Sequence, residues 1–211
     1  MRKMITVKIN GEERQYPQGA TYEDVANDYQ QEYENLIALA ARDGKIRELF
    51  KKLTRDCEVT FFTLKDDVGN KTYVRSATML FLKAVFDVYG REAAQSCRVE
   101  FAIGNGSYIS PKGKINVTEE NAAKIRNRMR ELVEAKTPFL KRSYSLDNAM
   151  ELFRKEGMKD KEKLFRYRRG SFVNIYEMDG YYDYYYGYML PNAGYVKWFD
   201  VIAYEDGFML L

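Results

Sequence analysis

The sequence predicts an α+β protein, in which a small sheet-and-helix domain is followed by a larger α+β domain with an antiparallel sheet and packed helices. Three observations support this fold class. Short segments that alternate apolar and polar residues open the chain, and segments with apolar residues at helical spacing fill its middle. Aromatic and β-branched residues alternate between turns near its end. We place the two domains at residues 1–64 and 65–211.

The first domain has the element order of a β-grasp, ubiquitin-like unit. Asn10-Gly11 is a pair that favours a tight hairpin turn between two strands. Thr21 is expected to cap a helix, and Asp24, three residues later, completes a capping-box pattern. The expected elements are strands at residues 4–9 and 12–16, a helix at 21–29, and strands at 36–41 and 58–63.

The second domain begins after a polar segment, Lys65 to Thr72, which contains Gly69 and which we interpret as a junction. The next segment is apolar on nearly every side, as is typical of a helix inside a core. Further along, the sequence predicts a hairpin around Gly104-Asn105-Gly106, two capped helices and a closing antiparallel sheet. The expected ranges are 76–89, 99–109, 118–135, 145–155 and 172–211.

Composition narrows the class of protein. With 211 residues, 45% of them hydrophobic, the chain can bury a core without disulfides or metals. A net charge of +3 falls short of the basic signature of a dedicated nucleic-acid binder. Cys57 and Cys97 show no CxxC spacing, so we expect reduced core thiols and a cytoplasmic location. We find neither a signal peptide nor an apolar run that could span a membrane.

The chain contains no histidine. It therefore lacks the commonest general base near neutral pH and the commonest metal ligand. It also lacks the GxxxxGK[ST] loop of phosphate-binding enzymes, because the nearest candidate, around Gly113-Lys114, has the wrong spacing. No base–nucleophile pair emerges, so we predict no catalytic residues and favour a binding or regulatory role.

Two segments remain open to alternative interpretations. Six tyrosines lie between residues 180 and 194, either as strand residues that pack in a sheet or as a stacking platform for a nucleobase. Residues 154–169 hold eight basic and three acidic residues, a net charge of +5. That segment is either a solvated face or a surface that contacts phosphates. The candidates for RNA or phosphate contact are Arg166, Tyr167, Arg168 and Arg169.

Several motifs together resemble the N-terminal region of threonyl-tRNA synthetases. ITVKINGEERQYPQGATYEDVA resembles their TGS domain. AIGNGSY, KIRNRMRELVEAKTPFLKR, SLDNAMELFR and DYYYGYMLPNAG resemble their second additional domain, which removes mischarged serine from tRNA. The resemblance covers most of residues 4–204. It implies that Asn105 borders a pocket and that Asp183 aligns with an acidic residue of the family's motif.

The same resemblance implies a zinc site that this sequence does not reproduce. Setting RSATM and DYYYGYMLP against the family's two metal motifs puts Arg75, Met79, Tyr185 and Met189 at the four ligand positions. None of these side chains is a competent zinc ligand at neutral pH. We therefore expect no bound metal, and we interpret the four residues, with Asn105 and Asp183, as a candidate ligand pocket.

The tyrosine-rich segment and the run DKEKLFRYRRGSFVNIY also resemble bacterial nucleoside kinases, usually described as uridine kinases. These carry the same pair of domains ahead of a kinase domain. The resemblance implies a non-catalytic module that regulates the kinase or recognises a ligand or RNA. ATP and magnesium are then expected only where a kinase domain follows.

Two alternatives stay open: a metal-free hydrolase of mischarged tRNA, and an adaptor that binds tRNA or the ribosome. The candidate partners are a kinase domain in the same chain, tRNA or a nucleotide, and a second copy of the chain. A membrane partner is not expected.

Overall fold

A computed structural model describes residues 4–166 and 170–211. By their contacts these residues form two compact units. The first comprises Met1–Ser76 together with Gly187–Pro191, and the second comprises Ala77–Tyr186 and Asn192–Leu211. We describe each unit by itself. None of the described helices is both long enough and apolar enough to cross a lipid bilayer.

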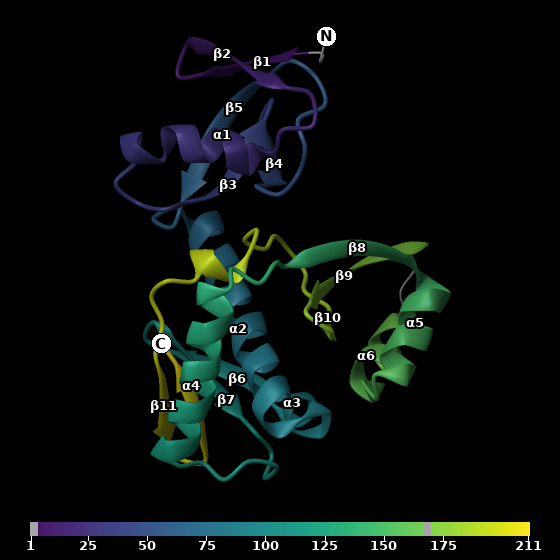
Figure 1. The fold of residues 1–211 in the computed structure, drawn as a ribbon. Helices are drawn as coiled ribbons and strands as arrows, with labels where there is room; N and C mark the ends of the chain where they lie inside the picture. The colour runs from purple at the N-terminus through teal and green to yellow at the C-terminus, as the bar shows by residue number, and fades with distance from the viewer. Residues whose placement is uncertain (1–3, 167–169) are drawn as a thin grey trace. The chain divides into compact units, whose positions relative to one another are not determined.

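The first unit has the β-grasp arrangement that the sequence predicts, with a five-stranded sheet in the order β2-β1-β5-β3-β4. Antiparallel β1 and β2 form the opening hairpin, and β5 lies parallel to β1 in the middle of the sheet. Helix α1 lies on one face of this sheet (Figure 1). The elements are β1 (Met4–Ile9), β2 (Glu12–Pro17), α1 (Tyr22–Tyr29), the 3-10 helix η1 (Gln30–Glu32), β3 (Ile37–Arg42), β4 (Lys45–Glu48) and β5 (Cys57–Thr63).

Local sequence signals account for these elements. Ile5, Val7 and Ile9 are all buried on the inner face of β1, as their alternation predicts. The capping box at the start of α1 is confirmed, since the Thr21 side chain accepts from the Asp24 amide and the Asp24 side chain accepts from the Thr21 amide.

The predicted polar junction at residues 65–72 is wrong, because α2 (Asp67–Tyr89) begins inside it. The Asp66 carbonyl accepts from the Asn70 amide, which starts the helical hydrogen-bond pattern. Gly69 is a helical residue that passes close to the Thr63 backbone, where a Cβ would lie 1.9 Å from the carbonyl oxygen. Because it has no side chain, Gly69 permits this close approach at the start of α2. In the sequence alone, such a glycine looks like a loop residue.

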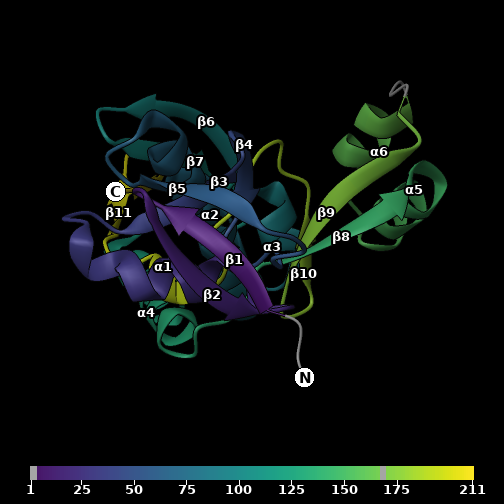
Figure 2. The same ribbon diagram turned by 90° about the horizontal axis from the view of Figure 1, so that it is seen from above.

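The second unit contains two antiparallel sheets where the sequence analysis expected one closing sheet. One has the order β11-β12-β7-β6 and the other β10-β9-β8. Helices α5 and α6, which connect the paired strands β8 and β9, lie beside these strands in both views (Figure 2). The strands are β6 (Arg98–Ile103), β7 (Gly106–Ser110), β8 (Leu140–Ser145), β9 (Phe172–Met178), β10 (Tyr181–Asp183), β11 (Val201–Tyr204) and β12 (Gly207–Leu210). The helices are α3 (Arg91–Ser96), α4 (Glu119–Glu134), α5 (Leu146–Lys155), α6 (Lys159–Arg166) and η2 (Ala193–Tyr195).

The expected single sheet from residue 172 onward divides because the tyrosine run leaves the strand conformation after Asp183. Strand β9 pairs with β8, an element that the sequence analysis missed, and β12 pairs with β7. The chain turns at Asp179-Gly180, where φ is 44° and 80°. This turn closes the β9–β10 hairpin, in which Tyr181 lies opposite Met178.

A buried lysine ties this hairpin to α2. The Lys83 side chain is 2% exposed, and its ammonium group donates to the Asp179 carbonyl oxygen at 2.7 Å. The same ammonium group pairs with Asp87 at 2.7 Å, and Arg128 of α4 reaches the other oxygen of Asp87 at 2.8 Å. This network joins α2, α4 and the β9–β10 turn inside the second unit.

Candidate functional site

The six predicted pocket residues are divided between the two units of the structure. Arg75 and Met189 belong to the first unit, while Met79, Asn105, Asp183 and Tyr185 belong to the second. Within the second unit, Asp183 and Tyr185 line a common cavity. Met79 is fully buried and is not part of the cavity wall, and Asn105 lies exposed at the tip of the β6–β7 hairpin.

In the first unit, a network of hydrogen bonds holds the segment 187–191. The Arg75 guanidinium donates to the Tyr188 carbonyl oxygen at 2.6 Å, and the Met189 amide donates to the buried Glu48 carboxylate at 3.2 Å. Ser76 Oγ donates to the Thr72 carbonyl oxygen at 2.8 Å and lies 3.9 Å from the sulfur of Met189. Arg75 and Met189 therefore act here as structural residues that hold this segment.

The zinc ion that the resemblance implies does not fit these residues. Arg75 directs its guanidinium at a backbone carbonyl, and the fully buried Met189 side chain has its sulfur 3.9 Å from the Ser76 hydroxyl. Zinc sites in proteins use thiolate, imidazole or carboxylate ligands, and none of the four positions supplies one. Among residues 4–166 and 170–211 no group of three or more Cys, Asp or Glu side chains is placed to hold a metal ion.

We predict that the purified chain, after washing with a chelator and incubation with zinc, retains no stoichiometric metal. Atomic absorption of the desalted protein measures this directly. One tightly held zinc per chain would contradict the assignment of Arg75 and Met189 as structural residues.

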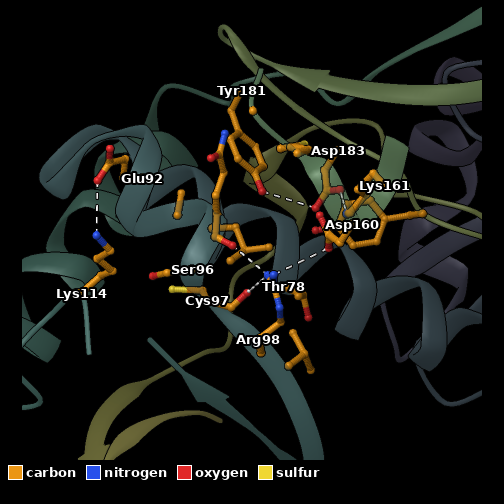
Figure 3. Close-up of a pocket in the computed structure, with 17 residues that line it drawn as sticks. Thr78, Glu92, Ser96, Cys97, Arg98, Lys114, Asp160, Lys161, Tyr181 and Asp183 are labelled. Carbon is orange, nitrogen blue, oxygen red and sulfur yellow. Dashed lines mark hydrogen bonds and ion pairs between the residues drawn. The ribbon is translucent and has the colours of Figure 1, made fainter. Parts of the chain in front are cut away.

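The second unit contains a cavity of about 530 Å³. Its wall is built from α2, α3, the start of β6, the segment before and into α6, and β10 with the residues that follow it (Figure 3). Volumes of this size are typical of sites for small ligands. The cavity therefore offers a site in the second unit that needs no metal.

A buried ion pair lies in the cavity wall. The Lys161 ammonium group pairs with the Asp183 carboxylate, and the side chains of the two residues are 23% and 5% exposed. Asp183 also accepts from the Tyr184 amide at 2.7 Å and from the Tyr181 hydroxyl at 3.3 Å. These bonds fix the carboxylate where β10 ends, facing α6 (Figure 3).

Burial changes the acid–base behaviour of the cavity wall. Desolvation lowers the pKa of Lys161 to about 8, and the Arg98 guanidinium acts in the same direction, while the Asp160 carboxylate opposes this decrease. Burial raises the pKa of the Cys97 thiol to about 12, and it also raises the pKa of Tyr181. Cys97 and Tyr181 therefore stay neutral at physiological pH, and Lys161 is the group of the wall that can exchange a proton near pH 8.

Two more exposed ion pairs line the same cavity. Arg98 lies 3.8 Å from Asp160, and Lys114 lies 3.4 Å from Glu92. About half or more of each of these side chains is exposed, so the pairs contribute little to stability. They leave both signs of charge available to a polar ligand.

The basic segment 154–169 is only partly a solvated surface. Lys161 faces the cavity, and Arg154 pairs with Glu162 at 2.9 Å. Arg166 is exposed at the end of α6, which is consistent with either interpretation of this segment. The predicted RNA contacts Tyr167, Arg168 and Arg169 lie outside the described residues.

Sequence reasoning missed Lys161 as a site residue, although the pattern held a signal. Met158, Lys161, Glu162 and Phe165 recur at helical spacing, and Met158 and Phe165 are buried. A lysine on that stripe faces inward and needs an acidic partner, which Asp183 supplies.

Three of the six tyrosines in the run pack against other rings. Tyr181 is buried and lies 5.7 Å from Phe86 by ring centroids, and Tyr184 meets Phe165 edge-on at 4.9 Å. Tyr185 lines the cavity and lies edge-on to Tyr176 at 6.4 Å. Tyr186 is 86% exposed. Packing thus accounts for Tyr181 and Tyr184, and Tyr185 offers an aromatic surface to a ligand.

Comparison with known proteins gives distant relatives of one kind. No family model matches the chain. A threonine–tRNA ligase of Thermotoga neapolitana is 28% identical over 98% of this chain and 31% of its own length. Those of Thermotoga maritima and Porphyromonas gingivalis are 28% and 25% identical, over 97% and 89% of this chain. The chain spans about a third of the length of the curated relatives it matches. It is thus distantly similar, over nearly its whole length, to the N-terminal region of threonine–tRNA ligases.

Proposed function

We propose that this chain is a non-catalytic recognition module that binds a small polar ligand in the cavity of its second unit. The observation that carries this proposal is the Lys161–Asp183 pair, which is buried in the wall of a cavity of about 530 Å³. An ion pair in such a wall gives a ligand both a donor and an acceptor, and Tyr185 adds an apolar ring surface.

The similarity to threonine–tRNA ligases suggests the class of ligand. A protein with such relatives is expected to meet the aminoacylated end of tRNA, which is an amino acid ester of adenosine. Because Arg75, Met79, Tyr185 and Met189 cannot supply a zinc site, recognition of a nucleoside or an aminoacyl-nucleoside without hydrolysis is the simplest role for the cavity.

Calorimetric titration tests this proposal with three probes: adenosine, uridine and a non-hydrolysable seryl-adenosine amide. We expect at least one probe to bind, and Lys161→Met to weaken that binding about tenfold, the effect of losing a charged hydrogen bond. Lys163→Met is the matched control, because Lys163 is exposed on the same helix. The proposal would be contradicted if Lys163→Met weakened binding as much as Lys161→Met does. It would also be contradicted if none of the probes bound.

One observation favours a second function, a metal-free hydrolase of mischarged tRNA. An amine with a pKa of about 8 is partly neutral near physiological pH, as a general base requires. The test is release of serine from seryl-tRNA, in parallel with the binding assay. Hydrolysis faster than the spontaneous rate would establish this function if Lys161→Met abolishes it. Binding without hydrolysis favours recognition alone.

We further propose that the module accompanies a nucleoside kinase domain. The tyrosine-rich segment and residues 160–176 support this by their resemblance to uridine kinases. The test is the mass of the natural gene product, combined with an assay for ATP- and magnesium-dependent phosphorylation of uridine. A longer product that phosphorylates uridine is expected, and a natural product without this activity would contradict the proposal.

A further inference from the structure

The first unit contains a cluster of cationic groups that the proposed function does not use. Arg42 is the last residue of β3, and Arg47 lies opposite Ala40 on the neighbouring strand β4. Side chains two residues apart on a strand point to the same face, and so do directly opposed residues. Arg42 and Arg47 therefore share one face of the β3–β4 hairpin. Phe61 lies opposite Ala40 on β5 and contacts Tyr29 of α1, so this is the face that α1 covers.

A buried hydroxyl lies beside the two arginines. Tyr22, the first residue of α1, is 1% exposed, and its buried hydroxyl donates to no acceptor among the residues that the structure describes. Burial raises the pKa of Tyr22, while the charges of Arg42 and Arg47 and a hydrogen bond from the Arg42 side chain act against that increase, so the Arg42 guanidinium lies close to the hydroxyl oxygen. A buried O–H without an acceptor is costly, which favours a ligand that accepts its proton in a hydrogen bond.

Among residues 4–166 and 170–211, neither Arg42 nor Arg47 forms a salt bridge. The charge of Arg42 acts on the Asp43 carboxylate and helps to lower its pKa. Two carboxylates on the adjoining segments have closer partners. Asp43 pairs with Arg55 at 2.9 Å, and Asp56 accepts from the Thr6 amide at 2.8 Å.

Arg42 is also oriented by the segment between β4 and β5. Its Nη1 donates to the Thr54 hydroxyl at 3.1 Å, which holds the guanidinium beside the start of α1. The Tyr22 amide donates to the Lys51 carbonyl oxygen of the same segment at 3.0 Å, so α1 and this segment are fixed to each other. The donors are therefore arranged before any ligand arrives, which lowers the entropy cost of binding.

We propose that Arg42, Arg47 and the Tyr22 hydroxyl form a binding site for the phosphate group of an anionic ligand. Guanidinium groups present paired N–H donors that match phosphate oxygens, and a phenol adds a third donor. The site lies within the first unit and does not depend on the cavity of the second, so the two proposals fail or succeed separately.

The test is an NMR titration of the whole chain with inorganic phosphate at fixed ionic strength, followed at the side-chain N–H signals of arginine. A saturable change is expected, and Arg42→Gln with Arg47→Gln should raise the dissociation constant by about tenfold or more. Lys8→Gln is the matched control, since Lys8 is an exposed cation on β1 that alternates with the buried Val7 and Ile9 and so lies on the opposite face of the sheet, and it should change the constant little.

Tyr22→Phe separates a built site from a diffuse basic surface, because this change leaves the net charge unaltered. We expect Tyr22→Phe to bind phosphate several-fold more weakly than the unchanged chain, because the phenylalanine ring offers no hydroxyl donor. Equal phosphate binding by Tyr22→Phe and the unchanged chain would overturn the proposal. So would weakening by Lys8→Gln as large as that of the double variant.

Two further probes identify the source of the phosphate. Uridine 5′-monophosphate and a short single-stranded RNA are titrated in the same way, and tighter binding than that of inorganic phosphate shows which carrier the site accepts. If Tyr22→Phe weakens the binding of either probe, the site is supported. If added salt weakens the binding and Tyr22→Phe does not, the binding is due to general charge attraction and the proposal is overturned.

Discussion

Replacing Asp87 by alanine is expected to lower the free energy of unfolding by about 3 kcal/mol. The change leaves the ammonium group of Lys83, whose side chain is 2% exposed, without its closest carboxylate. What remains to Lys83 is the Asp179 carbonyl oxygen and the Asp179 carboxylate at 3.3 Å, which is 68% exposed. We expect an effect of this size because a buried charge that loses its partner costs far more than a surface pair contributes. Urea unfolding, followed by circular dichroism, measures it.

Two variants test the cause of that loss. Adding Lys83→Met to Asp87→Ala should recover most of the stability, since no unpaired buried ammonium group then remains and Arg128 keeps its contact with Glu131 at 2.6 Å. Asp67→Ala is the matched control on the same helix, because it breaks the exposed Lys71–Asp67 pair and should cost about 0–1 kcal/mol. A double variant as unstable as Asp87→Ala alone would show that the carboxylate acts through something other than Lys83.

The first unit could be predicted well because its signals are local. The alternation of Ile5, Val7 and Ile9 and the capping pair of Thr21 and Asp24 each depend on residues a few positions apart. The start of α2 could not be predicted in this way. Gly69 favours a loop by composition, and its helical position is set by the approach of the Thr63 backbone, a contact between elements.

In the second unit, the capped helices α4 and α5 follow their sequence pattern, with the Thr118 and Ser145 side chains accepting from backbone amides. Strand pairing was the weak point. Strand β8 reads Leu-Lys-Arg-Ser-Tyr-Ser, which has little apolar alternation, so its pairing with β9 depends on tertiary context. Because β8 was not predicted, the C-terminal strands were the only partners that the predicted fold offered to β9.

The candidate site was only partly visible from sequence. Asp183 and Tyr185 were expected in a pocket and do line the cavity, whereas Arg75 and Met189 hold a backbone segment in the other unit. The resemblance to a metal site made the four ligand positions the predicted pocket residues. A side chain that no longer binds a metal can instead take a structural role, and Arg75 and Met189 do so. Lys161 was hidden in a charged run, where composition favours a solvent-exposed face.

The free energy of unfolding is expected to rise with pH across the range in which Lys161 loses its proton. In the folded chain the pKa of Lys161 is about 8, below its ordinary value of 10.5. Between these two values the unfolded chain binds more protons at this position than the folded chain, so raising the pH favours folding. The cost of burying the charged amine is thus fully present below pH 8 and is relieved as the pH approaches 10.5.

The difference between the two pKa values corresponds to about 3 kcal/mol, which is the largest change that Lys161 can contribute. Urea unfolding at several values from about pH 7.5 to about pH 10.5 measures the slope, and comparison with Lys161→Met removes the contributions of other lysines and tyrosines. The unchanged chain should gain stability relative to Lys161→Met as the pH rises, while Lys163→Met, on the exposed face of α6, should follow the unchanged chain. Parallel curves for the unchanged chain and Lys161→Met would mean that the Asp183 carboxylate fully offsets desolvation, and Lys161 would then have no neutral form to offer a substrate near pH 8.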